Sequence, residues 1–430
     1  MQNVKGTFDY RGEEQRLRNR IRSVLEDRFA LYDFEPMETA IVNECSLLAS
    51  KYAGGDEILK EMYTLSDQGG RELGLRYDLT VPFAKFVAGS AGLELPFKRY
   101  EIGKVFRDGP VKRGRLREFV QCDADIAGIT GPEAEAELMQ LAADVFRELG
   151  IAIVIKWNNR RFLGELLGRL GVGETWMPSV MLTLDKLEKI GAAGVEQELA
   201  DKGLEPDVYG PVVRLIEAEL PDFEELVTLF GLSDKEGTAE VRRLGSLLEG
   251  TGLNGICKFD PFLSRGLSFY TGTVYECFIA DGSFGSSLAS GGRYDAIIGK
   301  LAGKEQFNCP AVGLSFGLDS ILECCRGRVL EQRMEPVWLV PIGDTMVETL
   351  RAASMLRDAG IWAKLAPSGR KLKRTLAAAS AEGARYVILV GEEEAAAGQM
   401  KLKDMRAGEE MTASLPQLVC MLEKTVSKRK

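Results

Sequence analysis

The chain has 430 residues, of which 45% are hydrophobic and 28% charged, a composition typical of soluble globular proteins. This length exceeds one ordinary hydrophobic core and predicts two or three domains. No apolar run is long enough to span a bilayer, and the first residues contain no apolar signal segment, so we expect a cytoplasmic protein without membrane contact. The net charge of −9 disfavours a protein that coats nucleic acid without specificity.

The chain contains no histidine. This excludes a Ser-His-Asp triad, a Cys-His dyad and an HExxH metal site, and leaves carboxylates, substrate or water to move protons near neutral pH. The eight cysteines include no C-x-x-C pair, which favours free thiols and no metal held by the protein. Residues 331–430 carry a net charge of +3 and the rest −12. A basic tail hints at a polyanionic partner, although solvated surface charge gives the same pattern.

Hydrophobic spacing predicts the elements of the first half of the chain. Residues 11–32 have helical periodicity and end before Pro36. The other predicted elements are a strand leading into a helix at 71–87, two strands of a hairpin at 98–108 and 116–128, and a helix at 132–149. Because a hairpin joins two of these strands, we expect a largely antiparallel sheet flanked by helices.

The second half changes character twice. From about residue 158 to 252 the helical spacing predicts a helical insertion. A strand pattern returns at 273–280, and residues 309–325 read as a strand that runs into a helix. Beyond a polar linker, strands and helices alternate as βαβαβ, which predicts a small α/β domain with a parallel or mixed sheet. The expected fold class is therefore α+β, with a helical insertion and a C-terminal α/β domain.

A basic hairpin loop is the first candidate site. Five cations lie in or beside it: Arg107, Lys112, Arg113, Arg115 and Arg117. A solvated loop explains them equally well, but arginines that alternate along a strand share one face and suit phosphate or carboxylate. Gln121 and Asp125 follow in alternating phase. Arginines at the edge of a site, with a carboxylate at its base, suit a nucleotide that binds beside an amine.

Two other segments carry polar groups between apolar runs. RGLSFYTGTVYE contains Arg265, Tyr270 and Tyr275, and SGGRYD contains a pair of glycines before Tyr294. The glycines either let backbone approach a ligand closely or serve a tight turn, which the spacing favours. Asp78 lies where a strand meets a helix, and capping of that helix is the simpler interpretation.

Five segments resemble histidyl-tRNA synthetases of class II, and are closer to the eukaryotic-like branch: RYDLTVPFAKF, KRYEIGKVFRDGPVKRGRLREFVQCDADIAG, RGLSFYTGTVYE, SGGRYD and CPAVGLSFGLD. SGRKLKR and its surroundings resemble the anticodon-binding domain of that family. The resemblance covers nearly the whole chain. It implies a catalytic domain at 1–157 and 253–328, a helical insertion domain at 158–252 and an anticodon-binding α/β domain at 335–430.

The resemblance also implies a role for each matching residue. Arg107 and Arg265 are the catalytic arginines, and Arg265 neutralises charge on the α-phosphate where other class II enzymes place a metal ion. ATP is held by Arg107 and Arg115, with adenine stacked on Phe119. The implied histidine-binding residues are Asp78, Thr80 and Gln121 at the α-amino group, Asp125, Tyr270 and Tyr294 at the imidazole, and Arg265.

The implied reaction has two steps. The carboxylate of histidine attacks the α-phosphate of ATP, giving histidyl-adenylate and pyrophosphate, and the terminal ribose of tRNA(His) then takes the histidyl group. ATP brings Mg²⁺, and the family implies a homodimer. A chain without histidine codons can be translated when charged histidine tRNA is scarce, so we expect histidine starvation to induce it.

Five positions, in four places along the chain, depart from the family pattern. Ser320 replaces the arginine of motif 3, which removes a cation–π contact worth roughly 0.5–2 kcal/mol. The others are Ala40 for a proline, Leu116 for a tyrosine, and Ser268-Phe269 in place of Asp-Tyr. The alternative function is a histidine-sensing regulatory subunit of ATP phosphoribosyltransferase, a paralogue with the same catalytic fold. Arg107, Arg265 and the complete tail favour the synthetase.

Overall fold

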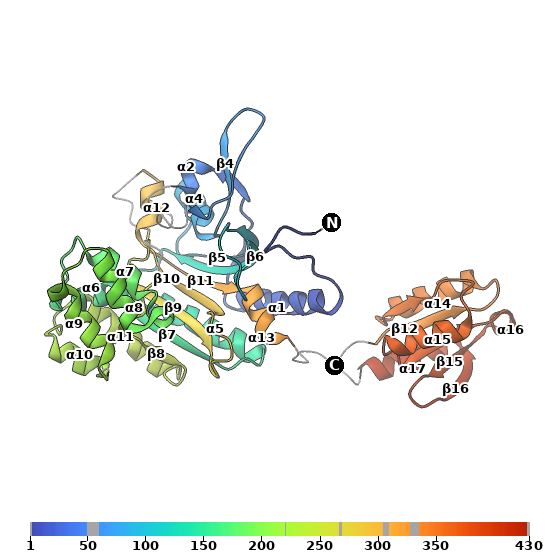
Figure 1. Cartoon of the computed structure of the whole chain (residues 1–430). Helices are drawn as coiled ribbons and strands as arrows, with labels where there is room; N and C mark the ends of the chain where they lie inside the picture. The colour runs from blue at the N-terminus through green and yellow to red at the C-terminus, as the bar shows by residue number, and fades with distance from the viewer. Residues whose placement is uncertain are drawn as a thin grey trace. The chain divides into compact units, whose positions relative to one another are not determined.

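The computed structural model describes residues 2–49, 60–219, 221–265, 269–303, 309–326 and 335–427. The chain forms two compact units, Met1–Arg328 and Val329–Lys430 (Figure 1). In the described parts, no helix is long and apolar enough to cross a membrane.

An eight-stranded sheet forms the centre of the first unit, in the order β1-β5-β6-β11-β10-β9-β7-β8. Its strands are β1 (Glu35–Pro36), β5 (Phe97–Phe106), β6 (Glu118–Ala127), β7 (Ile153–Asn159), β8 (Cys257–Phe259), β9 (Thr273–Ile279), β10 (Ala289–Arg293) and β11 (Ala311–Gly317). The pairs β1–β5 and β7–β8 are parallel, and the others are antiparallel. The prediction of a largely antiparallel sheet is therefore confirmed.

Helices cover the apolar face of this sheet. They include α1 (Gly12–Leu31), α5 (Glu133–Glu148) and α13 (Leu318–Cys325), while α4 (Thr80–Gly89) packs against α12 (Ala296–Leu301). Phe316 of β11 lies 6.0 Å from the ring of Phe29 in α1 and 5.7 Å from that of Phe146 in α5. Side chains alternate along a strand, so the residues on either side of Phe316 in β11 point away from these helices. The same holds for alternate residues of β6, and this second face of the sheet is available for polar groups.

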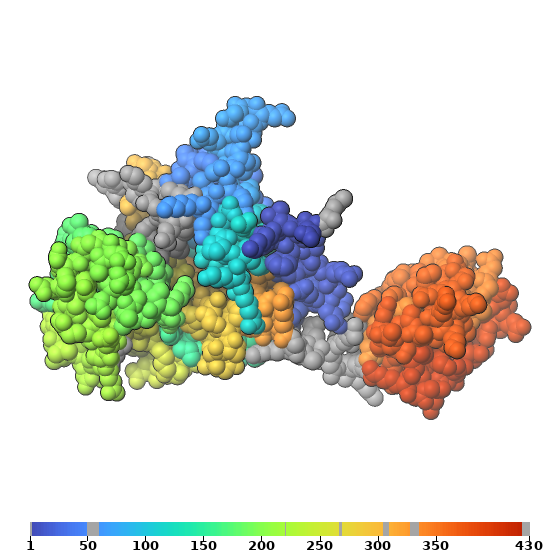
Figure 2. All heavy atoms as spheres, in the orientation of Figure 1, coloured from blue at the N-terminus to red at the C-terminus, as the bar shows by residue number. Residues whose placement is uncertain are grey.

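Residues between β7 and β8 form helices, as their periodicity predicts. These are α6 (Arg160–Arg169), α7 (Met177–Leu184), α8 (Leu187–Asp201), α9 (Pro206–Glu217), α10 (Phe223–Leu229) and α11 (Glu236–Gly250). A small sheet in the order β2-β4-β3 projects from the first unit (Figure 2). It contains β2 (Val42–Glu44), β3 (Thr64–Ser66) and β4 (Glu72–Leu75), next to α2 (Cys45–Leu48).

The second unit has a five-stranded mixed sheet in the order β13-β12-β14-β15-β16. Its elements are β12 (Val337–Pro341), α14 (Met346–Asp358), β13 (Ala363–Leu365), α15 (Leu372–Ala381), β14 (Tyr386–Val390), α16 (Glu392–Ala396), β15 (Gln399–Asp404), β16 (Glu410–Ser414) and α17 (Leu415–Ser427). The three βαβ strands are parallel, as predicted, and Leu339, Ile388 and Leu418 lie in a core of the unit's own. The antiparallel hairpin β15–β16 was not predicted.

Candidate active site

One face of the β5–β6 hairpin collects polar side chains. Arg99 pairs in register with Asp125, Glu101 with Asp123, and Gly103 with Gln121. Residues opposite each other in an antiparallel pair project to the same side. The sheet therefore brings together Gln121, Asp123 and Asp125, which we call the polar face; Asp123 and Arg99 were not among the predicted site residues.

Asp125 is held from two sides at the base of the polar face. Its Oδ2 lies 2.8 Å from Nη2 of Arg99, and its Oδ1 accepts a hydrogen bond from the hydroxyl of Tyr294. Arg99 is fully buried and also donates to the carbonyl of Leu79 at 2.9 Å. Burial raises the pKa of Asp125, while the charge of Arg99 and the bond from Tyr294 oppose that shift. The carboxyl is thus oriented before any ligand arrives.

Three glycines make room around this carboxyl. A Cβ on Gly313 would lie less than 3.0 Å from Asp125, and one on Gly291 would lie equally close to the carbonyl of Gly313. A Cβ on Gly292 would lie 2.9 Å from the ring of Tyr270. Because Gly291 and Gly292 are inside β10, the prediction of a tight turn there is wrong. These glycines serve close approach of backbone and side chains.

Gly313→Ala is expected to displace the Asp125 carboxyl. The added methyl group overlaps that carboxyl, and the surrounding strands leave it little room. The KM for histidine, the substrate that the sequence resemblance implies, should therefore rise by about 10-fold or more, and the melting temperature should fall. Gly168→Ala is the matched control, since nothing lies within 4 Å of a Cβ in that position of α6. Steady-state kinetics and thermal unfolding of both variants make the comparison, and equal KM values would contradict this role of Gly313.

Asp78 caps the helix that follows it. Its Oδ1 accepts the backbone N–H of Val81 at 3.0 Å, so the capping interpretation is confirmed. Burial raises the pKa of Asp78 to about 6, against the bond from Val81 and the positive charge of Arg107. Thr80 is the first residue of the capped helix, α4. Capping uses one carboxyl oxygen, and a carboxylate with two oxygens can also accept from a ligand.

Gln121 presents an oxygen to the polar face. Its Nε2 donates to the hydroxyl of Ser315 at 2.9 Å, and the other amide atom, Oε1, is buried without a hydrogen-bond partner among the described residues. Oδ1 of Asp123 is likewise buried without a hydrogen-bond partner among the described residues. A ligand that carries hydrogen-bonding groups would satisfy both atoms.

Three arginines converge beside the polar face. Burial lowers the pKa of Arg107, and the positive charges of Arg115 and Arg265 lower it further. The guanidinium of Arg107 lies 5.2 Å from the ring centre of Phe119 and donates from Nε to the carbonyl of Tyr77 at 2.9 Å. Cations that repel one another across a partly buried space are favourably placed for an anion between them.

Carboxylates hold two of these arginines. Arg115 is half exposed and pairs with Glu61 at 2.6 Å, whereas Arg265 pairs with Glu276 of β9. The remaining cations of the hairpin loop lie further out: Lys112 and Arg113 are exposed, and Arg117 pairs with Asp108 at 3.1 Å. The loop is therefore partly solvated, as the simpler interpretation allowed, and partly turned toward Arg107.

Ser320 lies beneath the tip of the hairpin loop. A Cβ on Gly114 would lie 3.6 Å from the Ser320 hydroxyl and 2.8 Å from the ring of Phe284. The neighbouring Asp319 was not among the predicted site residues. It accepts the backbone N–H of Val120 at 3.0 Å and pairs with Arg18 of α1, so α13 is tied to both β6 and α1.

The other residues that depart from the family pattern differ in their burial and contacts. Phe269 is buried, with its ring centre 4.7 Å from that of Tyr270. Ala40 is exposed, Leu116 is half-buried, and Ser268 lies outside the described residues. No group of three His, Cys, Asp or Glu side chains in the described ranges is arranged to hold a metal ion.

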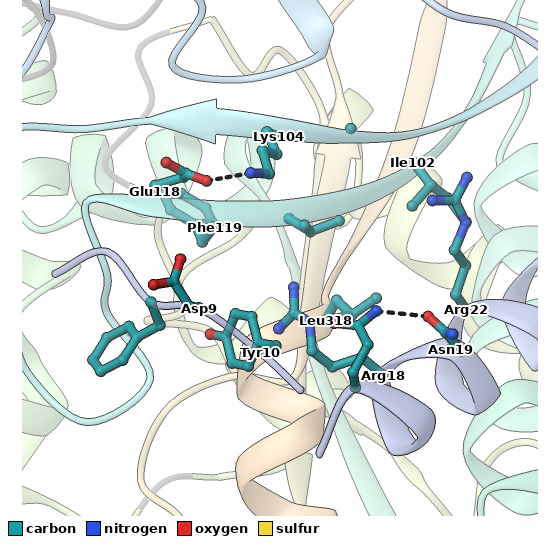
Figure 3. Close-up of a pocket in the computed structure, with 14 residues that line it drawn as sticks. Asp9, Tyr10, Arg18, Asn19, Arg22, Ile102, Lys104, Glu118, Phe119 and Leu318 are labelled. Carbon is teal, nitrogen blue, oxygen red and sulfur yellow. Dashed lines mark hydrogen bonds and ion pairs between the residues drawn. The ribbon is translucent and has the colours of Figure 1, made fainter. Parts of the chain in front are cut away.

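A cavity of about 440 Å³ lies between α1, the N-terminal segment and the β5–β6 hairpin (Figure 3). The residues that line this cavity include Tyr10, Arg18, Lys104 and Glu118, which are labelled in Figure 3. Lys104 forms an ion pair with Glu118. The predicted residue Phe119 also lines it. Gln121, Asp125 and the converging arginines are not among its lining residues, so this cavity is separate from the polar face.

Comparison with known proteins gives consistent results. A family model described as histidyl-tRNA synthetase matches residues 6–321, and one described as an anticodon binding domain matches residues 337–425. "Histidine--tRNA ligase 1" of Bacillus thuringiensis subsp. konkukian is 45% identical over 423 residues, 97% of this chain and 99% of that protein. "Histidine--tRNA ligase 2" of Shouchella clausii is 45% identical over 418 residues, 95% of this chain and 97% of that protein.

The fold has solved counterparts. A crystal structure of histidyl-tRNA synthetase from Nostoc sp. PCC 7120 matches with a TM-score of 0.81 and 26% identity, covering 100% of this chain and 99% of that one. The family model spans most of the chain, and the relatives match almost their full length. The chain therefore belongs to the histidyl-tRNA synthetase family.

Proposed function

We propose that this protein is a histidine--tRNA ligase, which activates histidine with ATP and transfers it to tRNA(His). The observation that carries the proposal is the position of Arg107, with the charges of Arg115 and Arg265 acting on it, beside a buried set of polar side-chain oxygens. The arginines suit the phosphates of ATP and the carboxylate of an amino acid. The acceptors suit its amino group and a ring that carries N–H donors.

In this proposal each substrate group meets a different part of the site. Arg107 and Arg265 hold the α-phosphate and the reacting carboxylate, and Arg115 leaves Glu61 to contact phosphate. Phe119 stacks on adenine. The α-amino group lies at Asp78, Thr80 and Gln121, and the imidazole lies between Asp125 and the hydroxyls of Tyr270 and Tyr294. Catalysis then comes from positioning and electrostatic stabilisation, and needs no protein nucleophile.

The accessory assignments belong to the same proposal. Mg²⁺ arrives with ATP, the protein works as a cytoplasmic homodimer, and the catalytic domain comprises 1–157 and 253–328 around an insertion domain at 158–252. Residues 335–430 bind the anticodon of the tRNA. The match of residues 337–425 to an anticodon-binding family supports this last assignment.

The alternative function, a histidine-sensing regulatory subunit, is not favoured. The two relatives described above, which match nearly the whole chain, are named histidine--tRNA ligases. A solved structure from Bacillus halodurans, described as an ATP phosphoribosyltransferase regulatory subunit/histidyl-tRNA synthetase, is only 21% identical and supports a shared fold alone.

Deletion of residues 329–430 separates the two steps of the proposed reaction. Each unit has its own core, so the remaining chain should fold and keep histidine-dependent exchange between ATP and pyrophosphate. Attachment of labelled histidine to tRNA(His) should fall by at least about 100-fold, because loss of the anticodon contacts removes binding energy of roughly 3 kcal/mol or more. Undiminished charging by the shortened chain would contradict an anticodon-binding role, and failure of the full chain to charge tRNA(His) would contradict the proposed function.

A further inference from the structure

Asp123 belongs to the polar face, between Gln121 and Asp125 on β6, but none of the substrate contacts proposed above uses it. Its side chain is 3% exposed. The hydroxyl of Ser315 hydrogen-bonds the carboxyl, while Oδ1 has no hydrogen-bond partner among the described residues. A buried polar atom without a partner is unfavourable, and a ligand that supplies the missing bond gains affinity from it.

Asp123 faces the same space as the proposed histidine-binding residues. The charges of Arg265, Asp123 and Asp125 all act on the hydroxyl of Tyr270, which places these groups around that hydroxyl. Strand β11 lies opposite, with Gly313 paired to Asp125 and Ser315 paired to Asp123. The small residues Gly313 and Ser315 of β11 therefore stand opposite the two carboxyls.

We propose that Asp123 is a specificity-determining residue, which hydrogen-bonds one ring nitrogen of histidine while Asp125 holds the other. This inference rests on the proposed function. Residues two apart on a strand are separated by about 6.6 Å. Two hydrogen bonds of about 2.8 Å each, with a five-membered ring between them, span somewhat more than this, a distance that two carboxyl groups reach when their side chains diverge from the strand. An amino acid whose ring lacks the second nitrogen leaves Asp123 unpaired.

The protonation states of Asp123 and Asp125 match the two nitrogens of a neutral imidazole ring. Neutral imidazole has one N–H donor and one bare nitrogen that accepts. Arg99 and Tyr294 stabilise negative charge on Asp125, which accepts the ring N–H. Burial and the charge of Asp125 raise the pKa of Asp123 to about 8, so at pH 7 its carboxyl carries a proton that it donates to the other nitrogen.

Several charged and titratable groups surround Asp123. The charged and titratable groups that face it are Arg99 and Glu101 from β5, Asp125 from β6, Asp78 before α4, Arg265 and Tyr270 before β9, and Tyr294 after β10. Glu101 is paired with Arg76 at 2.6 Å. Burial raises the pKa of Asp78 to about 6 and raises the pKa values of both tyrosines above their ordinary range. A change in histidine binding near pH 8 therefore reports on the buried pair Asp123 and Asp125, and variants of Asp123 separate the two carboxyls.

Asp123→Asn and Asp123→Ala in the full-length chain test the inference. Asparagine still donates a hydrogen bond but cannot lose a proton, and alanine can do neither. The KM for histidine and kcat are measured by pyrophosphate exchange from pH 6.5 to 9 for wild type, both variants and Asp144→Asn, a control on α5 outside the site. Thermal unfolding confirms that each variant is folded, and if the alanine variant is not, the asparagine variant carries the test.

We expect alanine to raise the KM for histidine by about 10- to 100-fold at pH 7 with a smaller change in kcat. In wild type the KM should rise up to about tenfold per pH unit above pH 8, because the deprotonated enzyme must take up a proton to bind the ring. Asp123→Asn should keep the low KM for histidine and should lose most of the rise in KM above pH 8. The part of the rise that remains comes from titration of the amino group of histidine itself.

A KM within twofold of wild type for Asp123→Ala, or the same pH profile for Asp123→Asn and wild type, would overturn the role of Asp123. Absence of exchange in wild type would instead reject the proposed function.

Discussion

Arg265→Ala is expected to lower kcat for histidine-dependent pyrophosphate exchange by about 100- to 1,000-fold, the usual effect of removing one preorganised donor to a developing negative charge. Arg265 lies close enough to Arg107 to lower its pKa, so both cations face the same space. The pair with Glu276 fixes the guanidinium on β9 before substrate arrives. The KM for histidine should rise less than kcat falls, because the charge on the α-phosphate develops mainly in the transition state.

The matched control for Arg265 is Arg71→Ala. Arg71 is also paired with a carboxylate, Asp67 at 2.6 Å, but its side chain is 75% exposed. An exposed pair contributes little to stability, so kinetics and thermal unfolding of this variant should be unchanged. If Arg265→Ala keeps kcat within threefold of wild type while folded, Arg265 is not a catalytic residue.

Asp125→Asn is the second substitution with a large expected effect. We expect it to raise the KM for histidine by at least about 100-fold. The amide cannot accept a ring N–H as strongly as a carboxylate, and a site built around that bond is left with unpaired polar groups. The variant also removes the ion pair at 2.8 Å with the fully buried Arg99, which should cost about 3–5 kcal/mol of folding free energy.

Calorimetric titration with histidine, with thermal unfolding alongside, measures both consequences of Asp125→Asn. Asp144→Asn again serves as the control, since Asp144 contacts Tyr32 and Arg147 on the helical side of the sheet. Because only Asp125→Asn removes the nearer carboxylate from the buried Arg99, the melting temperature should fall in that variant alone. Wild-type affinity for histidine in folded Asp125→Asn would exclude this residue from the imidazole pocket.

Local elements were predictable because their determinants are local. The helix predicted at 11–32 is α1, Gly12–Leu31, and the predicted hairpin strands are β5 and β6, because apolar spacing of 3.6 or 2 residues follows directly from the geometry of each element. The same alternation indicated that Gln121 and Asp125 share a face. It applies equally to Asp123, which could have been included from its phase alone.

The neighbours of the site could not be predicted in the same way. Arg99 meets Asp125 only because β5 and β6 pair in one particular register, and Gly313 lies beside Asp125 only because β11 is the next strand in the sheet. Strand order is set by packing of segments nearly two hundred positions apart, and hydrophobic periodicity carries no information about it. For the same reason, Gly291 and Gly292 were expected in a turn when they serve close approach inside β10.

The absence of histidine from the chain is compatible with this site. The residues proposed to act are arginine, aspartate, glutamine, threonine, tyrosine and phenylalanine, and catalysis by positioning needs no imidazole base. The hypothesis that the protein can be made when charged histidine tRNA is scarce predicts a higher protein level after histidine withdrawal. An unchanged level would count against it.

The central claim is that the polar face and its three arginines join histidine to AMP. Exchange of labelled pyrophosphate into ATP by the full-length chain, with each of the twenty amino acids supplied singly, tests it most directly. We predict exchange with histidine that exceeds every other amino acid by at least about 1,000-fold, the discrimination of a site whose buried polar groups need a partner. Exchange with no amino acid, or with one other than histidine, would contradict the account.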